Sequence, residues 1–194
     1  DIPVDNLYAT PVLLQAVRER IHGELTIVSP DAGGVYRAKK FREGLLHKFD
    51  VDAALAMIIK QRAKAGEVES MDLVGSVEDC DCIIVDDMCD TAGTLCKAAE
   101  LLLEYGAKEV HAYVTHGVLS GPAVERITNS VLKNLVITDT IAAPKPVQDC
   151  PQIRVLPTAP LFAQAILNIW NGTSVSSLFE TETMEPIYEG VFRS

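Results

Sequence analysis

The chain has 194 residues, of which 48% are apolar and 23% are charged, as is typical of a folded globular protein with one large domain. Its net charge of −10 argues against nucleic acid and membrane surfaces as partners, because both are polyanionic and attract basic faces. No apolar run is long enough to cross a bilayer and no secretory signal opens the chain, so neither membrane insertion nor secretion is predicted.

The cysteines are odd in number and lack the paired spacing of common zinc sites. Reduced thiols in a cytoplasmic protein are therefore the expected state. The cysteines are Cys80, Cys82, Cys89, Cys96 and Cys150.

Short apolar runs recur along the chain at intervals that suit strands. Several of these runs are apolar at every position, as expected for strands that are covered on both faces. The predicted strands are residues 25–29, 53–59, 82–85, 110–115, 135–138 and 153–156.

Amphipathic helical patterns lie between and after these runs. The first has Ala38, Phe41, Leu45 and Phe49 on one face, the second has Leu95, Ala98, Ala99 and Leu102 and stops at Gly106, and the third has Phe162, Ala165, Ile166 and Ile169. The alternation predicts an α/β protein with a mostly parallel sheet and helices on both faces. Ligands bind such sheets at the carboxyl ends of strands, which directs attention to the loops there.

The loop after the first predicted strand contains the tetrapeptide Asp31, Ala32, Gly33 and Gly34. Two glycines beside a carboxylate suit close backbone contact with a phosphate oxygen and a metal ion. A plain β-turn explains the same four residues, and the tetrapeptide alone favours the turn.

Basic residues follow the second predicted strand at Lys60, Arg62 and Lys64. A solvated basic loop is the usual explanation of such a cluster. Gly66 and small neighbours also suit a loop that closes on a substrate.

The third predicted strand leads into the most informative motif of the sequence. Two carboxylates, Asp86 and Asp87, are followed by a loop made of Asp90, Thr91, Ala92, Gly93 and Thr94. The amides and hydroxyls of this loop could converge on one phosphate, while ionised carboxylates accept hydrogen bonds from sugar hydroxyls or from metal-bound water. A simple acidic helix cap is the alternative, but a cap requires neither the paired acids nor the glycine.

This motif resembles the phosphoribosyl-pyrophosphate signature that type I phosphoribosyltransferases share with ribose-phosphate pyrophosphokinases. Other segments resemble the pyrophosphokinases, in the order of that family, from residue 1 to about residue 179. These segments are residues 5–9, 28–34, 60–62, 115–123 and 171–179. The resemblance corresponds to the C-terminal half of the family.

The resemblance implies a type I phosphoribosyltransferase-like fold over residues 1–179, followed by an acidic tail, residues 180–194, that we expect to be loosely ordered. It implies an ATP-dependent ribose-phosphate pyrophosphokinase, which converts ribose 5-phosphate into 5-phosphoribosyl-1-pyrophosphate. Residues 31–34 would bind pyrophosphate, with Asp31 as a ligand of Mg²⁺. Lys60 and Arg62 would act in catalysis. Ribose 5-phosphate would bind to Arg62, Asp86, Asp87, Asp90, Thr91, Ala92, Gly93 and Thr94.

The resemblance also implies regulatory contacts at Ser174, Ser176 and Phe179, and a homo-oligomer, which in this family is a hexamer built from dimers. The adenine contacts of the family belong to its N-terminal half, so the present chain is expected to be inactive alone. A non-catalytic regulatory paralogue and a true phosphoribosyltransferase are the competing interpretations. Intact Asp31, Lys60 and Arg62 disfavour the first, and the matches at both chain ends disfavour the second.

Overall fold

The computed structural model describes residues 2, 4–17, 23–61, 70–179 and 188. Within them the chain forms a seven-stranded sheet with the order β3-β2-β1-β4-β5-β6-β7. All neighbouring strands are parallel except β2 and β3, which pair antiparallel at one edge. The strands are β1 Leu25–Ser29, β2 Ala54–Gln61, β3 Ser70–Val74, β4 Asp81–Cys89, β5 Glu109–Gly117, β6 Asn134–Thr138 and β7 Ile153–Leu156.

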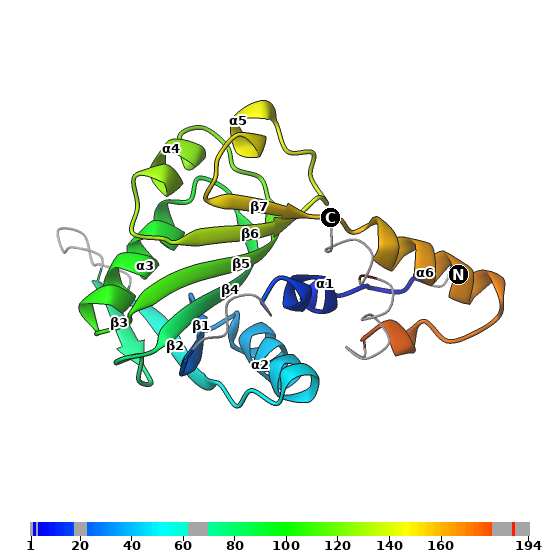
Figure 1. Ribbon diagram of the computed structural model, residues 1–194, viewed down its shortest axis with the longest axis horizontal. Helices are drawn as coiled ribbons and strands as arrows, with labels where there is room; N and C mark the ends of the chain where they lie inside the picture. The colour runs from blue at the N-terminus through cyan, green and yellow to red at the C-terminus, as the bar shows by residue number, and fades with distance from the viewer. Residues whose placement is uncertain (1, 3, 18–22, 62–69, 180–187, 189–194) are drawn as a thin grey trace.

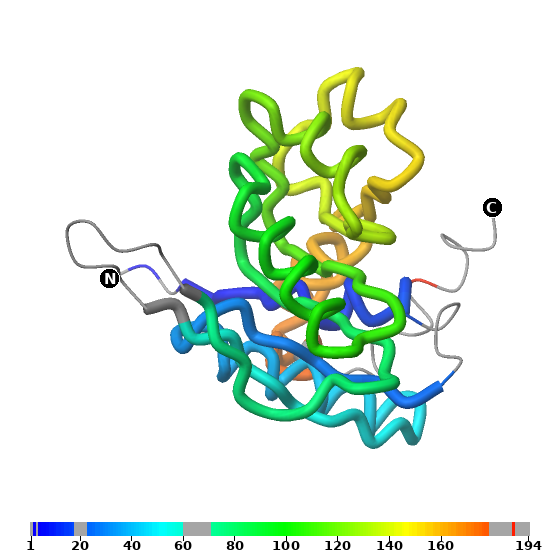
Figure 2. The backbone as a smooth tube through the Cα atoms, turned by 90° about the vertical axis from the view of Figure 1, so that its left-hand side faces the viewer, coloured from blue at the N-terminus to red at the C-terminus, as the bar shows by residue number. Residues whose placement is uncertain are grey.

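Helices cover both faces of this sheet (Figure 1). Helices α3, α4 and α5 pack on one face, and α1 and α2 pack on the other, so that each face has its own hydrophobic cluster. The helices are α1 Thr10–Gln15, α2 Val35–Phe49, α3 Gly93–Glu104, α4 Ala123–Thr128, α5 Lys145–Gln148 and α6 Ala159–Trp170, with a 3-10 turn, η2, at Ser176–Phe179. In Figure 2 the α2 and β2 segments lie at the bottom, the α3 segment in the middle and the α5 segment at the top.

The predicted mostly parallel α/β architecture is confirmed, and all six predicted strands are present. The third strand is longer than predicted, because β4 continues beyond Val85 to Cys89 and therefore includes Asp86 and Asp87. Strand β3 was not predicted, since five residues with two half-buried apolar side chains, Met71 and Leu73, give only a weak alternation.

The first two predicted helices are confirmed with the expected faces. Phe41 and Leu45 of α2 and Leu102 of α3 are completely buried. Helix α3 ends before Gly106, whose φ of 91° lets the Ala107 amide bond to the Leu102 carbonyl oxygen over 3.0 Å.

Of the face predicted for the third helix, only Ala165 is buried, and the rest of the prediction is wrong. Helix α6 packs through Leu161, Ala165 and Asn168, whereas Phe162, Ile166 and Ile169 are 50%, 65% and 63% exposed. The helix is apolar on most of its circumference, so apolar spacing alone did not identify the side that meets the core. Among the described residues α6 thus presents a continuous apolar face to solvent.

Residues after Phe179 are described only at Tyr188, whose side chain is buried and whose hydroxyl donates a hydrogen bond of 3.1 Å to the Pro157 carbonyl oxygen. The rest of the predicted tail lies outside the described residues. Within the described part of the chain, no helix is both long enough and apolar enough to span a bilayer.

Candidate functional site

The loops identified from the sequence follow four neighbouring strands of the sheet, β2, β1, β4 and β5. Strands β1 and β4 are paired directly, with Val28 opposite Ile84, so their loops lie side by side at the carboxyl edge. Helix α2 leaves β1 toward one face of the sheet, and α3 leaves β4 toward the other. The loops therefore diverge where the strand order reverses, and open α/β sheets bind ligands in the crevice at that point.

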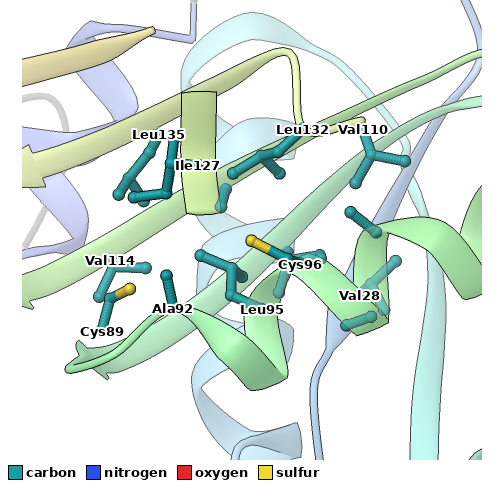
Figure 3. Close-up of a cluster of buried hydrophobic side chains, with 14 of the residues drawn as sticks. Val28, Cys89, Ala92, Leu95, Cys96, Val110, Val114, Ile127, Leu132 and Leu135 are labelled. Atoms are coloured by element: carbon teal, nitrogen blue, oxygen red, sulfur yellow. The ribbon is translucent and has the colours of Figure 1, made fainter. Parts of the chain in front are cut away.

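The loop of residues 90–94 is held from below by two buried side chains. Cys89 and Ala92 are both 4% exposed and point into the cluster around Leu95 and Val114 (Figure 3). Ala92 adopts the left-handed conformation, with a φ of 60°, which a non-glycine residue occupies at a cost of roughly 1–2 kcal/mol. Packing of the Ala92 methyl group offsets this cost and gives the loop a fixed bend directly before α3.

Gly93, the first residue of α3, is half-buried beside Arg126 and Thr91. A Cβ atom there would lie 3.5 Å from Arg126 Nη1 and 3.9 Å from Thr91 Oγ1, which are ordinary contact distances. Nothing in the protein therefore requires a glycine at this position. What a side chain would exclude is a ligand resting on the loop, as the sequence predicts.

A remote segment, residues 118–126, holds the outer side of the same loop. The main-chain carbonyl oxygens of Cys89, Asp90 and Thr91 all accept hydrogen bonds from it. The donors are Val118 N and Leu119 N to Cys89 O (3.0 and 3.1 Å), Ser120 N to Asp90 O (3.1 Å) and Arg126 Nη1 to Thr91 O (2.9 Å). The Ser120 hydroxyl also donates to the Asp90 carboxylate. Because these acceptors are already bonded to residues 118–126, the loop geometry is fixed before any ligand binds.

A cavity of about 440 Å³ opens beside this loop. Its lining combines hydroxyls, a glycine and two cations, a combination that suits an anion. The lining residues are Met71, Thr91, Gly93, Thr94, Cys96, Lys97 and Arg126. Lys97 and Arg126 were missed from the sequence. Lys97 lies one helical turn after Gly93, so its position beside the loop could have been predicted from helical spacing. Arg126 lies 35 residues from Thr91, and nothing in the sequence indicates that the two meet.

The two acids at the end of β4 are both paired with Arg37. Arg37 Nη1 lies 3.1 Å from Asp86 Oδ1, and Nη2 lies 2.9 Å from Asp87 Oδ2. The Asp86 carboxylate also accepts the Asp87 amide over 2.8 Å. Burial raises the pKa of Asp86 to about 6, and the adjacent Asp87 carboxylate adds to the rise while Arg37 opposes it. Arg37 was also missed from the sequence.

The loop of residues 31–34 is closed by its own side chains. The Gly34 amide donates to Asp31 Oδ1 over 2.9 Å, and the Ser29 hydroxyl donates to the Asp31 carbonyl oxygen over 2.7 Å. Asp31 is half-buried at the crevice. Among the described residues no three His, Cys, Asp or Glu side chains gather as a metal site. One carboxylate still suits Mg²⁺, which commonly takes one or two carboxylates and completes its shell with substrate phosphates and water.

The remaining predicted residues are resolved to different degrees. The backbone of Lys60 lies in β2 opposite Met71 of β3, while Arg62 lies outside the described residues. Ser174 precedes η2 and Ser176 is its first residue. The Ser176 amide donates to the Ser174 hydroxyl over 3.1 Å. Phe179 ends η2, which follows α6 and lies away from α3 (Figure 1). The structure therefore separates these three residues from the crevice.

The sheet order defines an open α/β protein whose strand order reverses between β1 and β4, the position at which such sheets bind ligands. The phosphoribosyl synthetase-associated domain family matches residues 20–180, and the chain belongs to this family.

The chain is similar to proteins from several bacteria. A ribose-phosphate pyrophosphokinase of Cereibacter sphaeroides is 58% identical over 196 residues, which cover 100% of this chain and 56% of that protein. Another ribose-phosphate pyrophosphokinase, of a Marinomonas species, is 51% identical over 179 residues, which cover 92% of this chain and 55% of that protein. The crystal structure of phosphoribosylpyrophosphate synthetase from Mycobacterium smegmatis matches with a TM-score of 0.78 and 36% identity. The match covers 89% of this chain and 54% of that one. The likeness confirms the predicted fold, and the chain spans about half the length of these relatives.

Proposed function

We propose that this chain supplies the ribose 5-phosphate and pyrophosphate sites of a ribose-phosphate pyrophosphokinase. The observation that carries the proposal is the position of two loops, residues 31–34 and 90–94, at the carboxyl ends of the paired strands β1 and β4. One loop suits a sugar phosphate, and the other suits a second phosphate group with a metal ion. A transfer between two phosphorylated substrates needs both on the same edge of the sheet.

The sugar phosphate would bind across the end of β4. The amides and hydroxyls of Thr91 and Thr94, with the open backbone at Gly93, would hold the 5-phosphate. Asp86 and Asp87 would accept hydrogen bonds from ribose hydroxyls. Asp90, whose carboxylate accepts the Ser120 hydroxyl, would bind ribose 5-phosphate at the entry to the loop.

In the proposed reaction the C1 oxygen of ribose 5-phosphate forms a bond to the β-phosphorus of ATP. The bond from that phosphorus to the oxygen bridging the α- and β-phosphates breaks, AMP leaves with the bridging oxygen, and the C1 hydroxyl loses its proton. Mg²⁺ held at Asp31 would supply charge neutralisation for the transferred group. Lys60 and Arg62 would add positive charge to the same group.

Assembly and location are part of the same proposal. Residues 1–179 would form one domain of a homo-oligomeric, cytoplasmic enzyme. The exposed apolar face of α6 supports contact with a second copy, and five free cysteines support a reducing compartment. Ser174, Ser176 and Phe179 would contact a regulatory anion away from the crevice. Sedimentation velocity tests the assembly: an Ile166→Lys variant should be less associated than the wild type.

Two measurements test the function. Titration of the chain with ribose 5-phosphate and Mg²⁺, followed by NMR, should shift amides of residues 31–34 and 86–94 and leave those of η2 unchanged. A full-length protein that contains this chain should release AMP from ATP only when ribose 5-phosphate is present. Binding without AMP release from the full-length protein would indicate a regulatory paralogue, and absence of binding would contradict the proposal.

A further inference from the structure

The guanidinium of Arg37 lies between the loop of residues 31–34 and the two acids, Asp86 and Asp87, that the proposed function assigns to the sugar. Arg37 belongs to the first turn of α2, three residues after Gly34. Its two terminal nitrogens reach Asp86 and Asp87 on β4, at 3.1 and 2.9 Å. The side chain therefore crosses from the end of β1 to the end of β4.

Gly34 leaves room for this crossing. A Cβ atom there would come within 2.7 Å of Ser29 Oγ and 3.2 Å of Arg37 Nη1. Its φ of −83° is open to any residue, so the backbone conformation does not require glycine. The absent side chain makes space for the Ser29 hydroxyl and, less tightly, for the guanidinium. The Gly34 amide donates to Asp31, and Arg37, three residues further along the chain, pairs with both acids, so that a short stretch of chain connects Asp31 with Asp86 and Asp87.

Arg37 also decides how the two acids are oriented. Asp86 and Asp87 are consecutive in β4, where successive side chains would point to opposite faces of a regular sheet and like charges repel. A planar guanidinium presents a separate nitrogen to each carboxylate, which an ammonium group cannot do. The Arg37 side chain is only 30% exposed, and it holds both carboxylates against one guanidinium.

We propose that Arg37 is a positioning residue that couples the loop of residues 31–34 to the sugar-binding acids, so that a ligand at one site raises the affinity at the other. The proposal rests on the proposed function. A pyrophosphate bound to residues 31–34 orders Gly34 and the start of α2, and thereby fixes Arg37 and the acids. The sugar phosphate that binds next then loses less conformational freedom.

Calorimetry tests the coupling directly. Ribose 5-phosphate is titrated into the chain with and without saturating pyrophosphate and Mg²⁺, and the ratio of the two dissociation constants is the coupling factor. Couplings between sites commonly fall at about 5–150-fold. We expect at least about 5-fold in the wild type, close to 1 in Arg37→Met, and an intermediate value in Arg37→Lys, which retains the charge but not the fork. Lys39→Met is the matched control, since Lys39 lies on the same helix and reaches only Glu43, at 3.9 Å, among the ion pairs of the described residues.

The outcomes separate the coupling from the function. If the wild type and Arg37→Met share the same coupling factor, or the wild type has none, the role of Arg37 is disproved while the substrate assignment stands. If the wild type does not bind ribose 5-phosphate, the proposed function and the coupling fall together. Should Arg37→Met unfold, Arg37→Lys decides the question, and wild-type coupling in that variant overturns the proposal.

Discussion

The Nη1 atom of Arg126 donates a hydrogen bond of 2.9 Å to the main-chain carbonyl oxygen of Thr91, 35 residues earlier in the chain. The bond joins α4 to the loop before α3, and it fixes a peptide group of the loop that would hold a phosphate. Arg126 also lines the cavity beside that loop. A residue in the sheet's next connection thus controls the geometry of the candidate phosphate loop.

Replacing Arg126 with Met should therefore weaken ribose 5-phosphate binding without unfolding the chain. One hydrogen bond of this kind contributes about 0.5–1.5 kcal/mol, so we expect roughly a 3- to 10-fold rise in the dissociation constant measured by calorimetry. Lys133→Met serves as the control, because Lys133 is an exposed cation paired with Glu109 at 3.1 Å. Equal affinities in the two variants would show that the Arg126 bond does not shape the loop.

Removing the Asp86 carboxylate should weaken ribose 5-phosphate binding more than the Arg126→Met substitution does. Asp86→Ala deletes a charged acceptor for the ribose hydroxyls and should reduce binding by about 1.5–3 kcal/mol. Asp149→Ala, at an exposed acid paired with Lys145, should bind as the wild type does. A folded Asp86→Ala protein with unchanged calorimetric affinity would remove Asp86 from the sugar site.

Ionisation of Asp86 should also make the free energy of unfolding depend on pH. Burial raises its folded-state pKa to about 6, above the ordinary value of 3.8, so the folded protein retains this proton over a range in which the unfolded chain has lost it. Stability contributed by Asp86 is therefore full at low pH and falls as pH rises to about 6. An Asp86→Asn variant cannot ionise, so its stability relative to the wild type should increase over that range. One pKa unit corresponds to about 1.4 kcal/mol, and we expect a gain on the order of 1–2 kcal/mol.

Denaturant unfolding of both proteins at several pH values measures this gain. The same series on Asp149→Asn provides the baseline for an exposed acid. A difference between Asp86→Asn and the wild type that stays constant, or that shrinks as pH rises, would contradict the assignment of the raised pKa.

Gly34 and Gly33 form a matched pair for a steric test. Gly34→Ala would bring a Cβ atom to 2.7 Å from Ser29 Oγ, whereas the nearest atom to a Cβ at Gly33 is Asp31 Oδ1, at 3.3 Å. Overpacking of this kind costs about 1–3 kcal/mol, so Gly34→Ala should lower the free energy of unfolding by that amount and Gly33→Ala by clearly less. Thermal and denaturant unfolding compare them. Equal losses would mean that the first turn of α2 shifts freely, and that Arg37 is not held by the absence of a side chain.

The sheet was predictable because its central strands are apolar at nearly every position. Strand β1 is fully buried, with only the small polar side chains of Thr26 and Ser29 among its apolar ones, and residues 82–85 of β4 are buried and entirely apolar. Helix α2 was predictable because only one of its faces is apolar. Helix α6 was not, because the residues that pack, Leu161 and Ala165, are no more apolar than Ile166 and Trp170, which do not.

Some residues of the candidate site were likewise predictable from the sequence, and others were not. Asp31, Asp86 and the loop of residues 90–94 are contiguous motifs at strand ends, and the sequence indicates them directly. Arg37 and Arg126 reach their partners across the fold, so their roles depend on which strands are neighbours. Spacing along one chain does not contain that information, and an isolated arginine on a helix is more often a solvated side chain.

The reaction rates of the buried thiols can report local unfolding of this protein. All five cysteines are free and buried, and burial raises the pKa of Cys82 and Cys89 to about 12. An alkylating reagent attacks the thiolate, so Cys82 and Cys89 offer it almost no reactive sulfur at neutral pH. Modification of these two thiols can proceed only as fast as the structure locally opens. Cys89 lies beneath the loop of residues 90–94 and Cys82 lies deep in β4, so their relative labelling rates compare opening at the crevice with opening of the whole sheet.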